Sequence, residues 1–227
     1  MHLWGFLVNS MTVIVGSVLG LLLSSRMPDS LKKIILSALG LATILIGAQM
    51  ALGTEKMIIV IGSLIAGGII GQLIGIEELL EKFGDGLQKK MKTTSSTFVP
   101  GFVTASILFC TGPMTIVGSL QDGFAQIGNL IYIKSIMDGV AAIALSASMG
   151  IGVLFSTLTV FTIQGALTLI GVLIGGSLDK IIMNEISATG GALILGLGFN
   201  ILGIAKIKVG NLLPALIIVG PLVWYFA

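Results

Sequence analysis

The charged residues of this chain fall into a few short clusters separated by long uncharged stretches, and this pattern constrains the fold most. Only 12 Lys and Arg and 10 Asp and Glu occur in 227 residues. A helix that crosses the hydrocarbon core of a bilayer needs about 20 mostly apolar residues. The uncharged stretches that fit one crossing each are 1–25, 34–54, 57–76, 93–121, 186–205 and 209–227. The stretch 139–178, with 40 residues, fits two. We therefore predict an all-α, polytopic transmembrane helix bundle of about eight helices.

Composition excludes several other classes of protein. The chain is 55% hydrophobic, with a mean hydropathy of +1.11, which is too apolar for a soluble protein of this length. Outer-membrane barrels alternate apolar and polar residues along each strand, and these uncharged stretches do not. A net charge of +2 does not indicate nucleic-acid binding. The first apolar stretch has no basic region before it, so we interpret it as a retained helix and not as a signal peptide.

Basic residues predict the orientation, because they concentrate in cytoplasmic loops. With the N-terminus outside, one set of loops holds nine Lys and Arg and the opposite set holds three. We therefore expect a multi-pass protein of the bacterial inner membrane with both termini outside. The helices expected from the sequence are 3–23, 31–52, 57–76, 98–120, 133–152, 154–174, 186–204 and 209–226.

Two segments of similar sequence suggest an internal repeat. Residues 37–53 and 187–203 share 8 of 17 positions without a gap, and the first expected helix matches the sixth with Asn9 aligned to Gln164. In the predicted topology these matched helices run in opposite directions. Inverted repeats are common in secondary transporters, where the substrate site lies at the repeat interface. We expect helices 1–3 (residues 1–76) and 6–8 (residues 154–227) to be related in this way around a central pair in 98–153.

One polar segment stands apart from the expected helices. Residues 77–97 begin as a mixed-charge amphipathic stretch, EELLEKFGDGLQKK, and continue as a polar link. The simplest interpretation is a cytoplasmic helical loop at the membrane surface. A regulatory or partner-binding role for 77–96 is the alternative.

The fourth expected helix contains a sequence that interrupts helical hydrogen bonding. Pro113 cannot donate a backbone hydrogen bond, which frees a carbonyl near Phe109. At bilayer depth such a break is tolerated only where it is buried in protein or lines a watery cavity. The hydroxyls of Thr111, Thr115 and Ser119 recur every four residues and share one helix face. We expect a discontinuity at 111–113 that is either a binding element or a simple kink whose hydroxyls bond their own backbone.

Ionisable and amide side chains inside apolar helices are candidates for function. Asp122 follows the predicted break. Asp138 has a structural explanation as well, because it would lie in the first turn of the fifth helix with Lys134 four residues away. Asn9 and Gln164 occupy matching repeat positions, although interhelical hydrogen bonding also explains them. The residues predicted to bind a substrate or ion are Thr111, Gly112, Pro113, Thr115, Ser119, Gln121, Asp122, Asp138, Asn9 and Gln164.

The chain resembles a known family. The segments FCTGPMTIVGSLQDG, VNSMTVIVGSVLG, QGALTLIG and GNLLPALIIVGPL resemble the bacterial integral membrane proteins of domain-of-unknown-function family 554. The resemblance covers essentially the whole chain. It implies a multi-spanning inner-membrane protein and no substrate.

These observations favour a transporter or channel for an ion or small polar solute over a membrane scaffold or regulator that acts through 77–96. No HExxH sequence, P-loop, cysteine cluster or Ser–His pairing occurs, so we do not expect an enzyme or a bound cofactor. The expected partners are the lipid bilayer and a small solute, with no nucleic acid. Glycine-rich faces would permit a homodimer.

Overall fold

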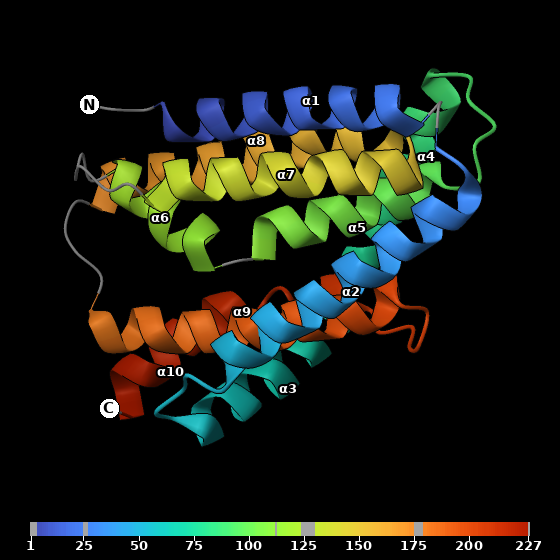
Figure 1. The fold of residues 1–227 in the computed structure, drawn as a ribbon. Helices are drawn as coiled ribbons and strands as arrows, with labels where there is room; N and C mark the ends of the chain where they lie inside the picture. The colour runs from blue at the N-terminus through green and yellow to red at the C-terminus, as the bar shows by residue number, and fades with distance from the viewer. Residues whose placement is uncertain (1–3, 25–26, 112, 124–129, 175–178, 227) are drawn as a thin grey trace. The chain divides into compact units, whose positions relative to one another are not determined.

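A computed structural model of the chain describes residues 4–24, 27–111, 113–123, 130–174 and 179–226. Every regular element in these ranges is helical (Figure 1). The helices are α1 (Gly5–Ser24), α2 (Asp29–Ala51), α3 (Met57–Ile74), α4 (Ile76–Lys90), α5 (Phe98–Thr111), α6 (Pro113–Gly123), α7 (Leu130–Met149), α8 (Gly152–Ile174), α9 (Lys180–Ile201), the 3-10 turn η1 (Val209–Leu212) and α10 (Ala215–Phe226). The predicted all-α architecture is confirmed.

Seven helical segments in the described residues are long and apolar enough to cross a bilayer, and α5 with α6 makes an eighth if the pair is one span. The seven segments are 18 to 23 residues long. At a rise of about 1.5 Å per residue they match a hydrocarbon core of about 30 Å. The fold is therefore a polytopic membrane-helix bundle.

The helix expected over 98–120 is broken where the sequence places its Thr-Gly-Pro segment. The axes of α5 and α6 differ by 71° (Figure 1). Gly112 lies outside the described residues, and α6 begins at Pro113. Because proline is favoured in the first turn of a helix, where its missing N–H is not needed, the sequence ends one helix and starts the next.

The helices group into two compact units, each described here by itself. Unit 1 contains 1–39, 81–110 and 114–177, and unit 2 contains 40–80, 111–113 and 178–227. In unit 1, α1, α7 and α8 lie side by side (Figure 1). A Cβ added to Gly16 would lie 2.2 Å from the carbonyl oxygen of Gly139, and one added to Gly20 would lie 2.3 Å from that of Ile143. These contacts advance together along both helices, so α1 and α7 run parallel.

The bent pair α5–α6 follows α8 along nearly its whole length. A Cβ added to Gly152 would lie 2.0 Å from the carbonyl oxygen of Phe98, and one added to Gly171 would lie 2.5 Å from that of Leu120. Nineteen residues of helix separate these two glycines, or about 29 Å, which is close to the thickness of the hydrocarbon core. The pair therefore lies along α8 over the length that one kinked crossing of the bilayer needs.

The parallel direction of α1 and α7 leads to the same conclusion. If α2, α3 and α5–α6 each cross the membrane once, α1 and α7 run in the same direction, as their contacts indicate. This count gives eight crossings, the upper of the two numbers that the helices allow.

Unit 1 is built around an apolar core of small and branched side chains. Its buried members are Val13, Ala105, Phe109, Cys110, Ala142, Leu145, Val153 and Val160. At the start of α5, the ring centroids of Phe83 in α4 and Phe102 lie 5.9 Å apart. The second half of α4 therefore packs on unit 1.

Unit 2 uses glycines for close helix contacts. On α3, Gly67 faces the backbone of Ala215 and Gly71 faces that of Asn211, at 2.3 and 1.9 Å from an added Cβ. Gly47 of α2 and Gly191 of α9 meet in the same way. Each substitution would push two backbones apart, so these glycines are close-packing positions of unit 2.

Candidate functional site: a buried polar cluster in unit 1

Three helices of unit 1 bring together four polar side chains that are far apart in the sequence. Asn9 of α1 donates through Nδ2 to Asp138 Oδ2 of α7 at 2.9 Å and to Gln164 Oε1 of α8 at 3.1 Å. Lys134, one turn before Asp138 on α7, forms an ion pair with the same carboxylate. We call Asn9, Lys134, Asp138 and Gln164 the polar cluster. Three of its four members, Asn9, Asp138 and Gln164, are among the predicted site residues.

The polar cluster is buried and lies deep in the span. Asn9 and Gln164 are fully buried, and the side chains of Lys134 and Asp138 are 6% and 11% exposed. Gln164 is twelve residues from the start of α8, or about 18 Å along its axis, near mid-span. The sequence analysis placed Asp138 in a first helical turn, which is wrong: α7 begins at Leu130, so Asp138 lies in its third turn. The dipole of a helix N-terminus therefore does not explain this carboxylate.

The hydrogen bonds determine how both amides are oriented. An ionised carboxylate only accepts hydrogen bonds, so the Asn9 nitrogen faces Asp138. The Gln164 atom that faces the same nitrogen must then be its oxygen. This leaves Asn9 Oδ1, an acceptor, and Gln164 Nε2, a donor, buried without a partner among the described residues. Buried polar groups are ordinarily satisfied, because an unmade hydrogen bond costs about 1–3 kcal/mol.

Unpartnered polar atoms are concentrated in unit 1. Eight buried side-chain atoms lack a partner within the described ranges, and seven of them belong to unit 1. They come from α1, α6, α7 and α8, which are the helices around the polar cluster. The seven residues are Asn9, Ser17, Ser119, Ser146, Thr157, Gln164 and Thr168.

The predicted hydroxyl face of the broken helix continues into α6. Thr115 and Ser119 are fully buried and Asp122 is 7% exposed, each about one turn from the next. Thr115 Oγ1 donates to the carbonyl oxygen of Phe109 at 2.8 Å. Without a proline at position 113, the backbone N–H of that residue would bond this carbonyl, so Thr115 substitutes for the missing donor.

The other residues of the predicted site are distributed around the break. Asp122 accepts from the backbone N–H of Gly5 at 3.1 Å, at the start of α1. Gln121 is half-buried, and Thr111 is fully buried at the end of α5. Pro113 begins α6, and Gly112 lies outside the described residues.

Ser119 lies on the part of α6 that packs against α8. The next residue, Leu120, contacts Gly171 through its carbonyl oxygen, and Gly123 contacts the backbone of Thr168. The hydroxyl of Ser119 is buried without a partner among the described residues.

Sequence reasoning missed two buried ionisable residues as parts of interior networks. Lys134 was treated only as a surface partner for Asp138, although its four-residue spacing placed it on the same face. Glu185 was counted as the polar edge of an apolar stretch, yet it is fully buried in α9. When a charged residue lies next to the end of an apolar stretch, the sequence does not indicate how deeply its side chain is buried.

Glu185 belongs to a network of unit 2 that holds a loop. Its carboxylate accepts from the hydroxyl of Thr54 and from the backbone N–H of Glu55, the latter at 2.9 Å. Asn184 Nδ2 donates to the carbonyl oxygen of Gly53 at 2.8 Å. These bonds connect the loop between α2 and α3 to α9, which is a structural role.

A second network of unit 2 fastens the start of α4. Glu77 donates its backbone N–H to Asn211 Oδ1 and accepts from the backbone N–H of Gly210, both at 2.8 Å. Lys208 forms an ion pair with Glu78. The hydrogen bond from Lys208 holds the pKa of the Glu78 carboxyl below its ordinary value of 4.5.

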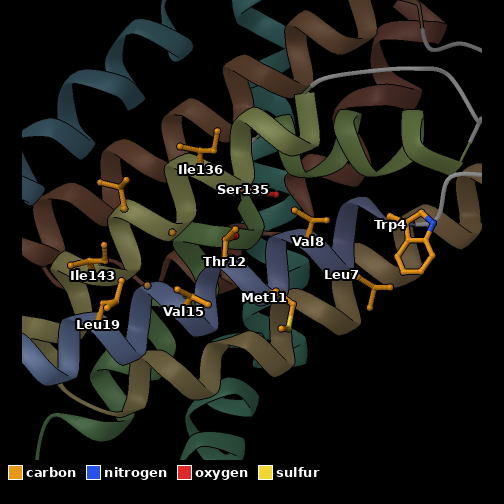
Figure 2. Close-up of a pocket in the computed structure, with 13 residues that line it drawn as sticks. Trp4, Leu7, Val8, Met11, Thr12, Val15, Leu19, Ser135, Ile136 and Ile143 are labelled. Carbon is orange, nitrogen blue, oxygen red and sulfur yellow. The ribbon is translucent and has the colours of Figure 1, made fainter.

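A surface depression of unit 1 is an apolar groove between α1 and α7 (Figure 2). It lies on the outer side of the helix pair, where Met11, Val15 and Val140 are well exposed. Such a surface suits lipid acyl chains and offers no charge to a polar solute. No group of three or more His, Cys, Asp or Glu in the described ranges is arranged to hold a metal ion.

Comparison with known proteins agrees with a membrane protein. The chain is 30% identical over 220 residues to the uncharacterized membrane protein YdfK of Bacillus subtilis (strain 168), covering 95% of this chain and 93% of that protein. It is 29% identical over 223 residues to the uncharacterized protein YqgA of Escherichia coli (strain K12), covering 96% and 95%. No solved structure matches. The family model described as protein of unknown function (DUF554) matches residues 4–224, so the chain belongs to that family.

Proposed function

We propose that the protein is a transporter or channel for an ion or small polar solute, in the bacterial inner membrane, with its site at the polar cluster. The observation that carries the proposal is a buried Lys134–Asp138 pair at depth beside unpartnered amide and hydroxyl atoms. Charged residues inside a membrane are costly and mark solute or ion pathways. A purely structural network would satisfy its donors and acceptors, as those of unit 2 largely do.

An inverted repeat would place the polar cluster at a repeat interface. Asn9 and Gln164, which occupy matching positions in the sequence repeat, are hydrogen-bonded to each other. The matched pairs α2 with α9 and α3 with η1–α10 are each packed antiparallel, as the order of their contacts indicates. Equivalent residues meet in this way where a local two-fold axis passes between matched helices. Such an interface is where secondary transporters bind substrate.

The broken helix has a positioning role in this proposal. The hydroxyl of Thr115 already donates a hydrogen bond to the freed carbonyl oxygen of Phe109. We therefore do not propose this carbonyl oxygen as the main group that binds the solute. The bend instead lets α6 follow α8, with Ser119 next to the α6 residues that contact α8. A change in the bend angle would move Ser119 and Asp122 relative to α1, which is a route to opening and closing the site.

Transport is tested directly in proteoliposomes that contain the purified full-length protein. Fluxes of Na⁺, K⁺ and H⁺ and counterflow of labelled small polar solutes are compared with protein-free liposomes and with Asp138→Asn. We expect a selective flux that Asp138→Asn reduces at least tenfold. If no ion or solute in the panel crosses faster than in protein-free liposomes, the proposed function is wrong.

The orientation is tested by labelling introduced cysteines in a background without Cys110, which is the single native cysteine. Lys56→Cys lies in a loop proposed to be outside, and Lys92→Cys lies in one proposed to be cytoplasmic. An impermeant maleimide should label position 56 in intact cells and position 92 only after permeabilisation. The reverse pattern would contradict the proposed orientation.

A scaffold or regulator acting through 77–96 is the second candidate. One observation favours it: Leu79 and Phe83 on amphipathic α4 are 55% and 52% exposed. The double change Leu79→Ser and Phe83→Ser should leave flux unchanged if the protein is a transporter. Loss of a cellular phenotype with normal flux would favour the regulatory role.

A further inference from the structure

The charge balance of the polar cluster limits which solutes it can hold. Lys134 and Asp138 are adjacent on α7, oppositely charged and buried, so the cluster carries no net formal charge. A lone cation that approaches Asp138 also approaches the Lys134 ammonium. A lone anion meets the reverse problem. Because like charges repel strongly at low dielectric, a solute with no net charge fits this cluster best.

The unpartnered atoms add a requirement for hydrogen-bonding groups. Asn9 Oδ1 needs a donor and Gln164 Nε2 needs an acceptor, and both lie on fully buried side chains. The two atoms belong to amides that are bonded to each other at 3.1 Å, so a single small molecule can reach both. The solute must therefore present a donor group and an acceptor group a few bonds apart.

We propose that the solute is a small zwitterion of the amino-acid type, an inference that rests on the proposed transport function. Its ammonium would be bound by the Asp138 carboxylate and Asn9 Oδ1. Its carboxylate would be bound by the Lys134 ammonium and Gln164 Nε2. Each charged group of the solute thus meets one opposite charge and one neutral hydrogen-bonding atom, as charge-assisted recognition requires.

The packing around the polar cluster favours a short side chain on the solute. One turn from Asn9 and one turn from Gln164 lie the fully buried Val13 and Val160, and Ala142 lies one turn beyond Asp138. These residues form the apolar core of unit 1 and close the cluster on that side. Glycine, alanine and serine are therefore the probes to use first.

The ion pair keeps the polar cluster at zero net charge when no solute is bound. Without solute, Lys134 and Asp138 neutralise each other. With a zwitterion, each takes a charge of the solute instead, and the total charge is again zero. The site would then reorient across the membrane without carrying net charge in either state, so zwitterion flux should not depend on membrane potential.

Counterflow in proteoliposomes tests this inference. Uptake of labelled glycine, alanine and serine is compared with that of acetate and ethylamine, which carry one charged group each. We expect at least one zwitterion to be taken up at ten times the rate in protein-free liposomes, with neither single-charge compound competing. Setting a potential with K⁺ and valinomycin should change the initial rate less than twofold.

Variants identify the site. Lys134→Met and Asp138→Asn should each lower zwitterion uptake at least tenfold, and so should the double variant, in which no charge is left unpaired. Glu185→Gln, at a fully buried carboxylate of unit 2, is the matched control and should retain uptake. Wild-type uptake in the double variant would overturn the assignment of the site.

The outcomes separate the inference from the proposed function. Flux of a single ion, or of a polyol such as glycerol, without zwitterion uptake would overturn the zwitterion inference and leave transport standing. Absence of flux for every ion and solute tested would overturn both.

Discussion

Unit 1 and unit 2 both bury ionisable side chains, but they use them differently. In unit 2 the carboxylates of Glu185 and Glu77 accept from backbone N–H groups of loops and helix starts. In unit 1, Asp122 also accepts from a backbone N–H, that of Gly5, whereas the partners of Asp138 among the described residues are the side chains of Asn9 and Lys134. Backbone partners fix a loop in one arrangement, whereas side-chain partners can exchange for a solute. Burial alone therefore does not separate a structural carboxylate from a candidate site.

The two units also differ in how many of their buried polar atoms lack a hydrogen-bond partner. Seven of the eight unpartnered buried side-chain atoms in the described ranges lie in unit 1. In unit 2 even the amide of Asn200 is used on both sides, donating to and accepting from the backbone of Ile207. A region that tolerates unmade hydrogen bonds in its interior has a reason other than stability for its polar groups.

The largest change in stability that we expect comes from substituting Lys134 in unit 1. Lys134→Met leaves Asp138 as an uncompensated buried charge, which should lower the free energy of unfolding by about 3–5 kcal/mol. Cys110 is buried in unit 1, so the temperature at which it reacts with a thiol-specific dye reports unfolding there.

The double variant Lys134→Met with Asp138→Leu should regain most of that stability, because it removes both charges. Lys180→Met, at an exposed lysine, is the control and should melt like the wild type. Equal melting of the single and double variants would show that the pair is not electrostatically coupled.

In unit 2 the corresponding change should affect stability and not transport. Glu185→Ala leaves the Thr54 hydroxyl and the Glu55 N–H without their acceptor and should cost about 1–3 kcal/mol. Circular dichroism in detergent measures the shift in melting temperature. Flux per folded molecule should equal that of the wild type. A loss of flux in correctly folded protein would place Glu185 in the transport path and erase the contrast between the units.

Removing an unpartnered buried atom of unit 1 should leave the free energy of unfolding unchanged or raise it. Ser119→Ala deletes a buried hydroxyl that has no partner among the described residues, so the free energy of unfolding should be unchanged or rise by up to about 1 kcal/mol. Thermal unfolding without added solute measures this. Destabilisation by more than about 1 kcal/mol would mean that the hydroxyl makes a hydrogen bond in the membrane.

The smallest effect concerns the exposed pair at the start of α4. The pKa of Glu78 is lowered by the hydrogen bond from Lys208. Because its folded-state pKa lies below its ordinary value of 4.5, the pair stabilises the protein above pH 4.5 and this contribution disappears as pH falls through the lowered pKa. Glu78→Gln should therefore melt slightly below the wild type at pH 7, and the difference should shrink as the pH falls below 4.5.

High salt should also remove the small difference at pH 7, because exposed ion pairs are screened. A difference between Glu78→Gln and the wild type that does not shrink in high salt or as the pH falls would mean that packing, and not charge, explains the effect of this substitution.

Sequence reasoning reached the membrane architecture because the bilayer imposes simple rules. The spacing of charges predicted the crossings, and Pro113 with its neighbours predicted where one of them would break. Glycines are frequent in membrane helices because they let backbones approach closely, and Gly16, Gly67 and Gly71 lie against a neighbouring backbone. These features depend on local composition, which a sequence displays directly.

Only part of the polar cluster could be predicted from the sequence. Asn9 and Gln164 drew attention because amides are rare in apolar helices and because they align in the repeat. Their bond to each other, and the bond of Asn9 to Asp138, join residues 155 and 129 positions apart. No local pattern specifies such pairings.

The sequence by itself thus determined that this is a multi-spanning helical membrane protein, because apolar length and charge spacing are enough to decide which segments enter a bilayer. The tertiary structure decided which buried charges are anchors and which form a candidate site. That difference depends on whether a carboxylate faces a backbone N–H or the side chains of another helix, and helix packing alone sets those neighbours.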